Sequence, residues 1–278
     1  MIRVGIGGWN YEPWRGTFFP KKLSKTKELH HASRRVTSIE VNSTFYGTFN
    51  SKTLGKWFDE TPDDFIFSLK APRFAVSRRI LGEAGPAIAK FFESGVSELK
   101  SKLGPILWQL PPFKEYDADD IEAFLSLLPK SIEGRKLRHV LEVRYESFQT
   151  QDFILQARKA NVGIVLADAP KYPLIADLTS DFVYLRLQVA NAEIETGYSA
   201  EDLHRWTELA CAWQKGEEPE EFPLLHREEI HTTHAMCLST SSTAPRNGHL
   251  PQLKPRSVFY RNSRLDAHLS KDWHPKFV

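Results

Sequence analysis

Charged side chains stand at comparable places in several apolar segments of this 278-residue chain. Three are carboxylates and three are cations, namely Glu40, Glu142 and Asp168, and Lys70, Arg144 and Arg186. A buried carboxylate beside cations can act as a general acid or base once its pKa is tuned. Arginine forks and a lysine ammonium bind carboxylate or phosphate groups. The set therefore predicts catalytic carboxylates, with Glu40 or Glu142 moving the proton, and three cations that hold a small anionic substrate.

Neutral polar and aromatic residues accompany the charged set. Asn42 and Gln109 add donors and acceptors that could bind the substrate and orient the acid–base group. Trp9, Tyr11 and Trp14 follow the first apolar segment. There they would either form a stacking wall for a sugar or base ring or cap the protein core. Both interpretations of these aromatic residues stay open.

The charged residues also have a structural interpretation. They could form a polar plug of mutual salt bridges that takes no part in a reaction. Collecting so many desolvated charges is costly for stability alone, which favours a functional site over a plug.

The segment 38–46 indicates how these side chains are positioned. Successive side chains of a strand point to opposite faces, so Ile39 and Val41 face one way while Glu40 and Asn42 face the other. The same alternation recurs along the chain and leaves polar residues at or near the C-terminal end of each strand. The segments expected as strands are 2–8, 38–43, 65–71, 105–110, 139–144, 163–168 and 182–187.

Segments with helical periodicity separate the expected strands. They are 25–34, 51–60, 86–103, 119–128, 151–160 and 200–214. Such alternation is typical of parallel strands joined by crossovers, in a (β/α)8 barrel or a doubly wound sheet. The parity of the polar positions favours a TIM-type barrel, in which active sites lie at the C-terminal ends of the strands. Glu40 is then expected to meet Lys70 on the next strand and Arg186 on the far side.

Composition narrows the classes of function. The chain has 41% hydrophobic and 26% charged residues, and its formal net charge of +2 gives no reason to expect a nucleic-acid or membrane partner. No apolar run approaches the roughly 20 residues of a membrane span. Cys211 and Cys237 lack a metal or redox spacing, which fits a cytoplasmic protein. The oligomeric state is not indicated.

No cofactor is predicted from the motifs. Gly5, Gly7 and Gly8 lack the spacing of a dinucleotide fingerprint and are better explained by close approach of the backbone. A P-loop and a serine nucleophile elbow are both missing from the sequence. The three carboxylates could hold Mg²⁺, although the neighbouring cations would compete with the metal.

Five ordered motifs carry a family resemblance. They are 8–20, 39–46, 70–73, 104–112 and 181–187. Together they resemble the domain of unknown function 72 family over residues 2 to 215. The resemblance implies a TIM-type barrel of unassigned activity, loosely similar in architecture to xylose isomerase and the apurinic endonucleases. Tyr145, Phe148 and Gln188 stand where family members tend to have His, Trp and His, so a role that needs those imidazoles is not expected.

The alternation stops after about residue 230, where an eighth strand and a closing helix are due. Back-translation from His234, read two bases later, permits an apolar strand similar to the closing strand of the family. We therefore expect a barrel domain over 1–233 and an irregular, out-of-frame tail over 234–278. The eighth strand and closing helix would then be missing or replaced by the tail, leaving two strand edges unpaired.

Three classes of function follow. The preferred one is an enzyme acting on a small phosphate- or carboxylate-bearing molecule by general acid–base chemistry. A nuclease-like protein that processes nucleic acid is suggested by architectural analogy alone. A non-catalytic ligand-binding protein is the third, and a Glu40→Gln variant that binds without turnover would separate it from an enzyme.

Overall fold

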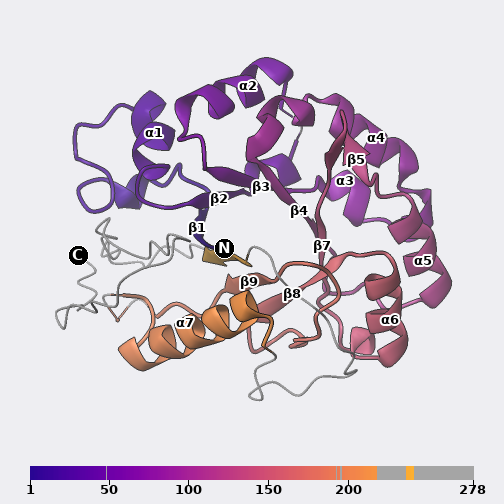
Figure 1. The fold of residues 1–278 in the computed structure, drawn as a ribbon. Coiled ribbons are helices and arrows are strands. Elements are labelled where there is room, and N and C mark those ends of the chain that lie inside the picture. The colour runs from indigo at the N-terminus through magenta and orange to yellow at the C-terminus, as the bar shows by residue number, and fades with distance from the viewer. Residues whose placement is uncertain (48, 192, 195, 218–235, 241–278) are drawn as a thin grey trace.

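The chain forms a closed barrel of parallel strands with helices on its outside (Figure 1). The computed structural model describes residues 1–217, apart from 48, 192 and 195, together with the backbone of 236–240. Within these residues the barrel strands are β1 (Ile2–Gly7), β2 (Ser38–Val41), β3 (Ile66–Lys70), β4 (Leu103–Gln109), β7 (His139–Glu142), β8 (Gly163–Asp168), β9 (Tyr184–Leu187) and β10 (Met236–Thr240). The predicted TIM-type barrel is therefore confirmed.

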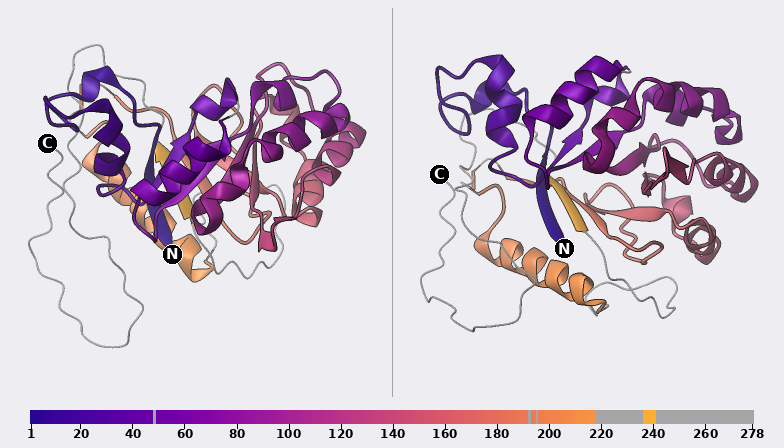
Figure 2. Two further views of the ribbon diagram at one scale, coloured as in Figure 1. Left: turned by 90° about the horizontal axis from the view of Figure 1, so that it is seen from above. Right: turned by 45° about the horizontal axis from the view of Figure 1, so that its top comes forward.

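Helices occupy the crossovers between these strands. They are α1 (Glu28–Ala32), α2 (Ser51–Glu60), α3 (Arg73–Val76), α4 (Gly85–Glu93), α5 (Ala118–Ser126), α6 (Gln151–Lys159) and α7 (Ala200–Lys215). Figure 2 shows α7 on the side of the strands opposite α2. The segment expected as one helix over 86–103 is divided, because Gly95 adopts the left-handed conformation at φ 103° and the chain continues as a 3-10 helix, Val96–Lys102. A short hairpin of β5 (Ser131–Ile132) and β6 (Arg135–Lys136) was not anticipated.

Strand β10 closes the barrel between β1 and β9. Its backbone pairs in parallel with both neighbours, with Leu238 opposite Val4 on one side and Leu185 on the other. The tail thus supplies a strand at the position of the eighth, the second of the two expected alternatives, and the two edges expected to be unpaired are both paired at this position. The strand lies in the segment 234–278 assigned to the tail, and the rest of that segment, with the place of the closing helix, lies outside the described residues. The shifted reading frame stays a prediction.

The core residues are divided between the two faces of each strand. Ile39, Val41 and Trp108 are buried between the strands and the surrounding helices. Leu107 and Val140, from the opposite face, pack with Tyr184 in a separate apolar cluster. The period-two pattern read from the sequence therefore divides the side chains between the barrel interior and the helix layer.

The lack of a side chain at Gly5 allows strands β1 and β2 to approach closely. A Cβ on Gly5 would lie 2.4 Å from Ser38 Oγ and 2.6 Å from the Ser38 carbonyl oxygen. The expectation that the N-terminal glycines allow close approach of the backbone is confirmed at this position.

In the part of the chain that the structure describes, no helix has the length and apolarity needed to cross a membrane.

Candidate functional site

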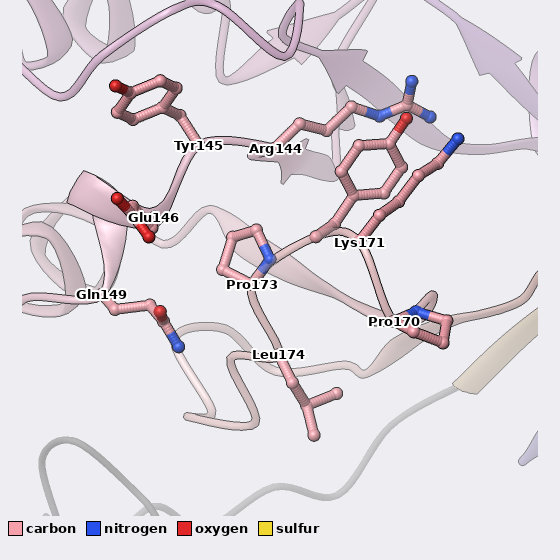
Figure 3. A pocket seen from close by; sticks show the side chains of 9 residues that line it. Arg144, Tyr145, Glu146, Gln149, Pro170, Lys171, Pro173 and Leu174 are labelled. Atoms are coloured by element: carbon pink, nitrogen blue, oxygen red, sulfur yellow. The ribbon is translucent and has the colours of Figure 1, made fainter.

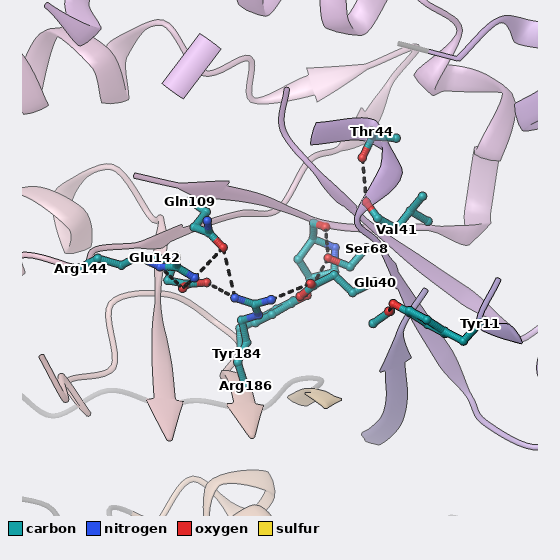
Figure 4. A network of polar contacts seen from close by, with 12 residues as sticks. Tyr11, Glu40, Val41, Thr44, Ser68, Gln109, Glu142, Arg144, Tyr184 and Arg186 are labelled. Carbon is teal, nitrogen blue, oxygen red and sulfur yellow. Dashed lines mark hydrogen bonds and ion pairs between the residues drawn. The ribbon is translucent and has the colours of Figure 1, made fainter. Parts of the chain in front are cut away.

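Inward-pointing side chains from strands far apart in sequence meet around one guanidinium (Figure 4). Arg186 on β9 donates from Nη2 to Glu40 Oε1 on β2 at 2.9 Å and from Nη1 to Glu142 Oε2 on β7 at 2.5 Å. The exposed fractions of the two carboxylate side chains are 0% and 1%, and that of Arg186 is 5%. Because an unpaired buried charge is costly, this bridge is what allows both carboxylates to lie inside the barrel.

Glu40 meets a hydroxyl with its second oxygen. The Tyr184 hydroxyl donates to Glu40 Oε2 at 2.8 Å and lies 2.9 Å from Ser68 Oγ. Ser68 Oγ also lies 2.8 Å from the Pro105 carbonyl oxygen, which accepts from it. All of these side chains are buried, so Glu40 is connected to a short chain of groups that carry exchangeable protons.

Glu142 is instead enclosed by guanidinium groups. Its Oε1 accepts from Arg144 Nε at 2.7 Å, while Oε2 faces Arg186. Burial alone would raise the pKa of Glu142, but Arg186 and Arg144 outweigh it and lower that pKa. In turn, the negative charges of Glu40 and Glu142 outweigh the effect of burial on Arg186 and raise its pKa. Glu142 is therefore held as a carboxylate.

Gln109 links the two arginines. Its side-chain oxygen accepts from Arg144 Nη2 at 2.9 Å and from Arg186 Nη1 at 3.3 Å. An amide oxygen can accept two such bonds, so Gln109 fixes the spacing of the two guanidinium groups without adding charge. We call Glu40, Gln109, Glu142 and Arg186 the buried floor of the site.

Lys70 lies at the end of β3 with a half-buried side chain. Its Nζ stands 4.4 Å from the centroid of the Phe45 ring, and within the described residues no carboxylate makes an ion pair with it. Burial, and after it the charge of Arg186, lowers the pKa of Lys70 to about 8; Glu40 and Glu142 oppose this shift, and Arg144 adds a smaller lowering. The expected contact between Glu40 and Arg186 is thus formed, whereas Glu40 and Lys70 do not form an ion pair.

Asp168 does not join the floor, which corrects its expected position. It is the last residue of β8, and its neighbour Ala167 stands opposite Arg186 in the sheet. Because Val165 and Ala167 belong to the interior cluster, Asp168 has the opposite parity. Its carboxylate accepts from the Tyr198 hydroxyl at 2.8 Å. Burial and this carboxylate both raise the pKa of Tyr198.

Asn42 shares the parity of Glu40 but lies one residue beyond β2. It is half-buried and stands at the start of a 3-10 turn, Ser43–Phe45. Its side chain makes no hydrogen bond within the part of the chain that the structure describes, so it remains available to a ligand.

The N-terminal aromatic residues cap the core. Trp9 packs edge-to-face on Trp57 at 5.1 Å between ring centroids, and Trp14 packs on Phe18 at the same separation. The Tyr11 hydroxyl donates to the Gly7 carbonyl oxygen. Trp9 and Trp14 are both buried, which favours the capping interpretation over a stacking wall.

A pocket of about 440 Å³ adjoins the floor beside Arg144 (Figure 3). It is lined by Arg144, Tyr145, Glu146, Gln149, Pro170, Lys171, Tyr172, Pro173 and Leu174. The Arg144 guanidinium lies 4.4 Å from the centroid of the Tyr172 ring, and Lys171 Nζ lies 5.1 Å from the same ring. The Arg144 side chain is 16% exposed, so it contacts both the buried floor and this pocket.

Lys171 and Tyr172 were not among the predicted site residues. They lie in the loop after β8, between Pro170 and Pro173, and a cation and an aromatic residue just past a barrel strand are a signal that the sequence contains. Gln188, which follows β9, has a buried Nε2 without a hydrogen bond in the described residues.

The three carboxylates that could have held Mg²⁺ do not come together in the described residues. The described residues contain no group of three His, Cys, Asp or Glu side chains placed to hold a metal ion. Arg186 lies between Glu40 and Glu142, and Asp168 is directed to Tyr198, so the three carboxylates do not converge.

Comparisons with known proteins agree with this architecture. A family model described as "Protein of unknown function DUF72" matches residues 3–246. The UPF0759 protein YecE of Escherichia coli (strain K12) is 24% identical over 94% of this chain and 100% of its own length.

Solved structures of DUF72 family proteins share the fold. One from Thermotoga maritima has a TM-score of 0.66 at 18% identity, covering 87% of this chain and 92% of that one. One from Enterococcus faecalis has a TM-score of 0.64 at 15% identity, covering 87% and 89%.

Proposed function

We propose that this chain, which belongs to the DUF72 family, is a TIM-barrel enzyme that acts on a small phosphate- or carboxylate-bearing molecule. The observation that carries the proposal is the position of two cations at the end of the barrel where active sites form. Arg144 lines a pocket, and Lys70 has no ion-pair partner within the described residues. Both side chains reach solvent, whereas the carboxylates beneath them do not.

The cations divide into two roles in this proposal. Arg186 is engaged through both of its terminal nitrogens by Glu40 and Glu142 and serves to hold the floor together. Arg144 uses part of its fork on Glu142 and Gln109 and presents its face to Tyr172 in the pocket. A planar guanidinium that is already oriented loses little entropy on binding an oxyanion, which suits Arg144 to hold the anionic group.

The two carboxylates also differ in suitability for acid–base chemistry. Both oxygens of Glu142 face guanidinium groups, so its protonation would disrupt two charge-assisted contacts. One oxygen of Glu40 meets the Tyr184 hydroxyl, which can pass a proton. We therefore assign the proton transfer to Glu40 and a charge-balancing role to Glu142. Asn42 and Gln109 orient the ligand and the Arg144 fork.

Thermal unfolding in the presence of anions tests the binding step. Phosphate, a sugar phosphate and a dicarboxylate should each be titrated into the wild-type chain and into Arg144→Gln. We expect at least one anion to raise the Tm of the wild type, because ligand at a hundred times its Kd stabilises a protein by about 2.7 kcal/mol. The Arg144→Gln chain should show a much smaller rise.

Lys159→Gln is the matched control for loss of one positive charge. Lys159 is exposed on α6 and pairs with Glu122 at 2.9 Å, away from the site. Its anion response should equal that of the wild type. A panel in which no anion stabilises the wild type, or in which both variants respond alike, would overturn the anionic-substrate proposal.

A Glu40→Gln variant tests catalysis once a binding anion is known. Binding retained with turnover lost supports the enzyme, because the amide keeps the shape of Glu40 and removes its proton transfer. Turnover unchanged in this variant contradicts the role of Glu40.

A nuclease is disfavoured by the missing metal cluster in the described residues and by the net charge of +2.

A further inference from the structure

We propose that Lys70 is a nucleophile that forms a Schiff base with an aldehyde or ketone group of the anionic substrate. The inference rests on the proposed function, since it places the substrate at the same end of the barrel. It adds a carbonyl group to the substrate class and covalent chemistry to the reaction. Neither follows from the anion site alone.

Lys70 is not needed to balance the buried charges of the site. Glu40 and Glu142 are the buried carboxylates of the floor, and the guanidinium groups of Arg186 and Arg144 occupy three of their four oxygens. The fourth oxygen accepts from Tyr184. Each carboxylate is therefore satisfied without Lys70, and a third cation close to two others has no structural task in balancing charge.

The position of Lys70 is fixed at its backbone. Thr44 Oγ1 donates to the Lys70 carbonyl oxygen at 2.6 Å, and the same hydroxyl contacts the Val41 carbonyl oxygen at 2.8 Å. These contacts tie the end of β3 to the turn after β2, part of which Figure 4 shows. The ring of Phe45 lies beside the ammonium group, with Lys70 Nζ 4.4 Å from the ring centroid, and contacts one side of it.

Burial and the neighbouring guanidinium groups favour the neutral amine, which is the nucleophilic form. With its pKa lowered to about 8, roughly a quarter of Lys70 is unprotonated at pH 7.5. A lysine at its ordinary pKa has roughly 0.1% of the neutral form at that pH. A lysine that is desolvated and stands near other cations is a recognised way of activating an amine for attack on a carbonyl carbon.

The reaction balances without an oxidant or a reductant. The amine nitrogen attacks the carbonyl carbon, the C=O π bond opens, and one amine proton moves to the oxygen to give a carbinolamine. The nitrogen lone pair then expels the hydroxyl group, which takes up a proton and leaves as water. The second amine proton is released, and one C=N bond has replaced one C=O bond.

Borohydride trapping tests the proposal on the full-length chain. Pyruvate and dihydroxyacetone phosphate serve as carbonyl-bearing anions, and lactate and glycerol 3-phosphate as the matched anions without a carbonyl. After reduction with sodium cyanoborohydride, peptide mass spectrometry locates the adducts. We expect one dominant adduct at Lys70 with at least one carbonyl probe, and none with lactate or glycerol 3-phosphate.

Two variants make the result specific. Lys70→Arg keeps the positive charge but removes the nucleophile, so the dominant adduct should disappear. Lys159→Arg changes an exposed lysine of α6 and should leave the Lys70 adduct unchanged. Adducts spread over surface lysines, or an equal yield in Lys70→Arg, would overturn the proposal.

The outcomes separate this inference from the anion site. A probe that raises the Tm without trapping at Lys70 refutes the Schiff base and leaves the anion site standing. Trapping at Lys70 without any rise in Tm supports the nucleophile and removes the support for anion recognition. If no probe raises the Tm and none is trapped at Lys70, both the Schiff base and the anion site are refuted.

Discussion

Replacement of Arg186 by glutamine tests whether the floor of the barrel is held by its central guanidinium. The change removes the contacts to Glu40 and Glu142 and leaves two carboxylates whose side chains are 0% and 1% exposed. Breaking a buried ion pair by removing one partner costs about 3–5 kcal/mol, because the remaining charge is left uncompensated. For a domain of this size, about 2–4 °C of Tm corresponds to each kcal/mol, which gives a loss of about 6–20 °C.

The pH dependence of that loss has a definite sign. In the wild type the pKa of Glu142 is lowered, so its contribution to stability is present above its unfolded pKa and is lost as pH falls. In Arg186→Gln, Glu142 keeps only its Arg144 partner, so less of this pH-dependent contribution remains. The difference in unfolding free energy between the two proteins should therefore shrink from pH 7 to pH 5.

Urea denaturation of both proteins at pH 7 and pH 5 measures this difference. Arg186→Lys is the control, since it keeps the charge but cannot bridge two carboxylates, and its loss should be intermediate. A loss below about 1 kcal/mol at pH 7 would show that the bridge contributes no more than an exposed ion pair. A difference that grows toward pH 5 would refute the assigned ionisation.

Two further predictions concern the rest of the chain. Burial lowers the pKa of His139 to about 4, below its unfolded value, so its contribution to stability should fall by about 3 kcal/mol as pH drops from 7 to 4. His139→Gln should flatten that fall in urea denaturation, and an unchanged pH profile would contradict it. Sequencing of the coding DNA should show an open frame, shifted by two bases from about codon 234, that encodes an apolar strand. A stop codon within a few codons of that frame contradicts the frameshift.

The strand pattern predicted the fold well because buried strands leave a strong signal. Ile39 and Val41 are buried on one face of β2 while Glu40 points inward, as the alternation indicates. The contact between Glu40 and Arg186 spans 146 residues, and strand parity together with barrel closure was sufficient to anticipate it. Periodicity carried no comparable signal for the hairpin of β5 and β6, whose strands have two residues each.

Side-chain partners were harder to predict than strand positions. Asp168 was placed by its nearness to the strand end, but parity directs it away from the interior and toward Tyr198. Tyr198 lies in a loop with no periodic pattern, so the sequence did not predict its hydrogen bond to Asp168. Lys70 was expected beside Glu40, yet that carboxylate is already satisfied by Arg186 and Tyr184. Competition among donors for one carboxylate is settled by geometry that a single sequence does not contain.

The plug and the functional site, which were rival interpretations of the charged residues, describe different depths of the same cluster. Exposure of the side chains increases from Glu40 at 0% and Glu142 at 1% through Arg186 at 5% to Arg144 at 16%. The deep charges neutralise one another, so removal of Arg186 should chiefly affect stability, whereas removal of Glu40 also takes away the proposed proton transfer. A ligand that approaches from solvent meets Arg144 and the half-buried Lys70 first, so removal of Arg144 should chiefly affect binding and removal of Lys70 should also affect the proposed covalent step. The floor has a functional consequence nonetheless, because the net field of its charges acts on the pKa of Lys70.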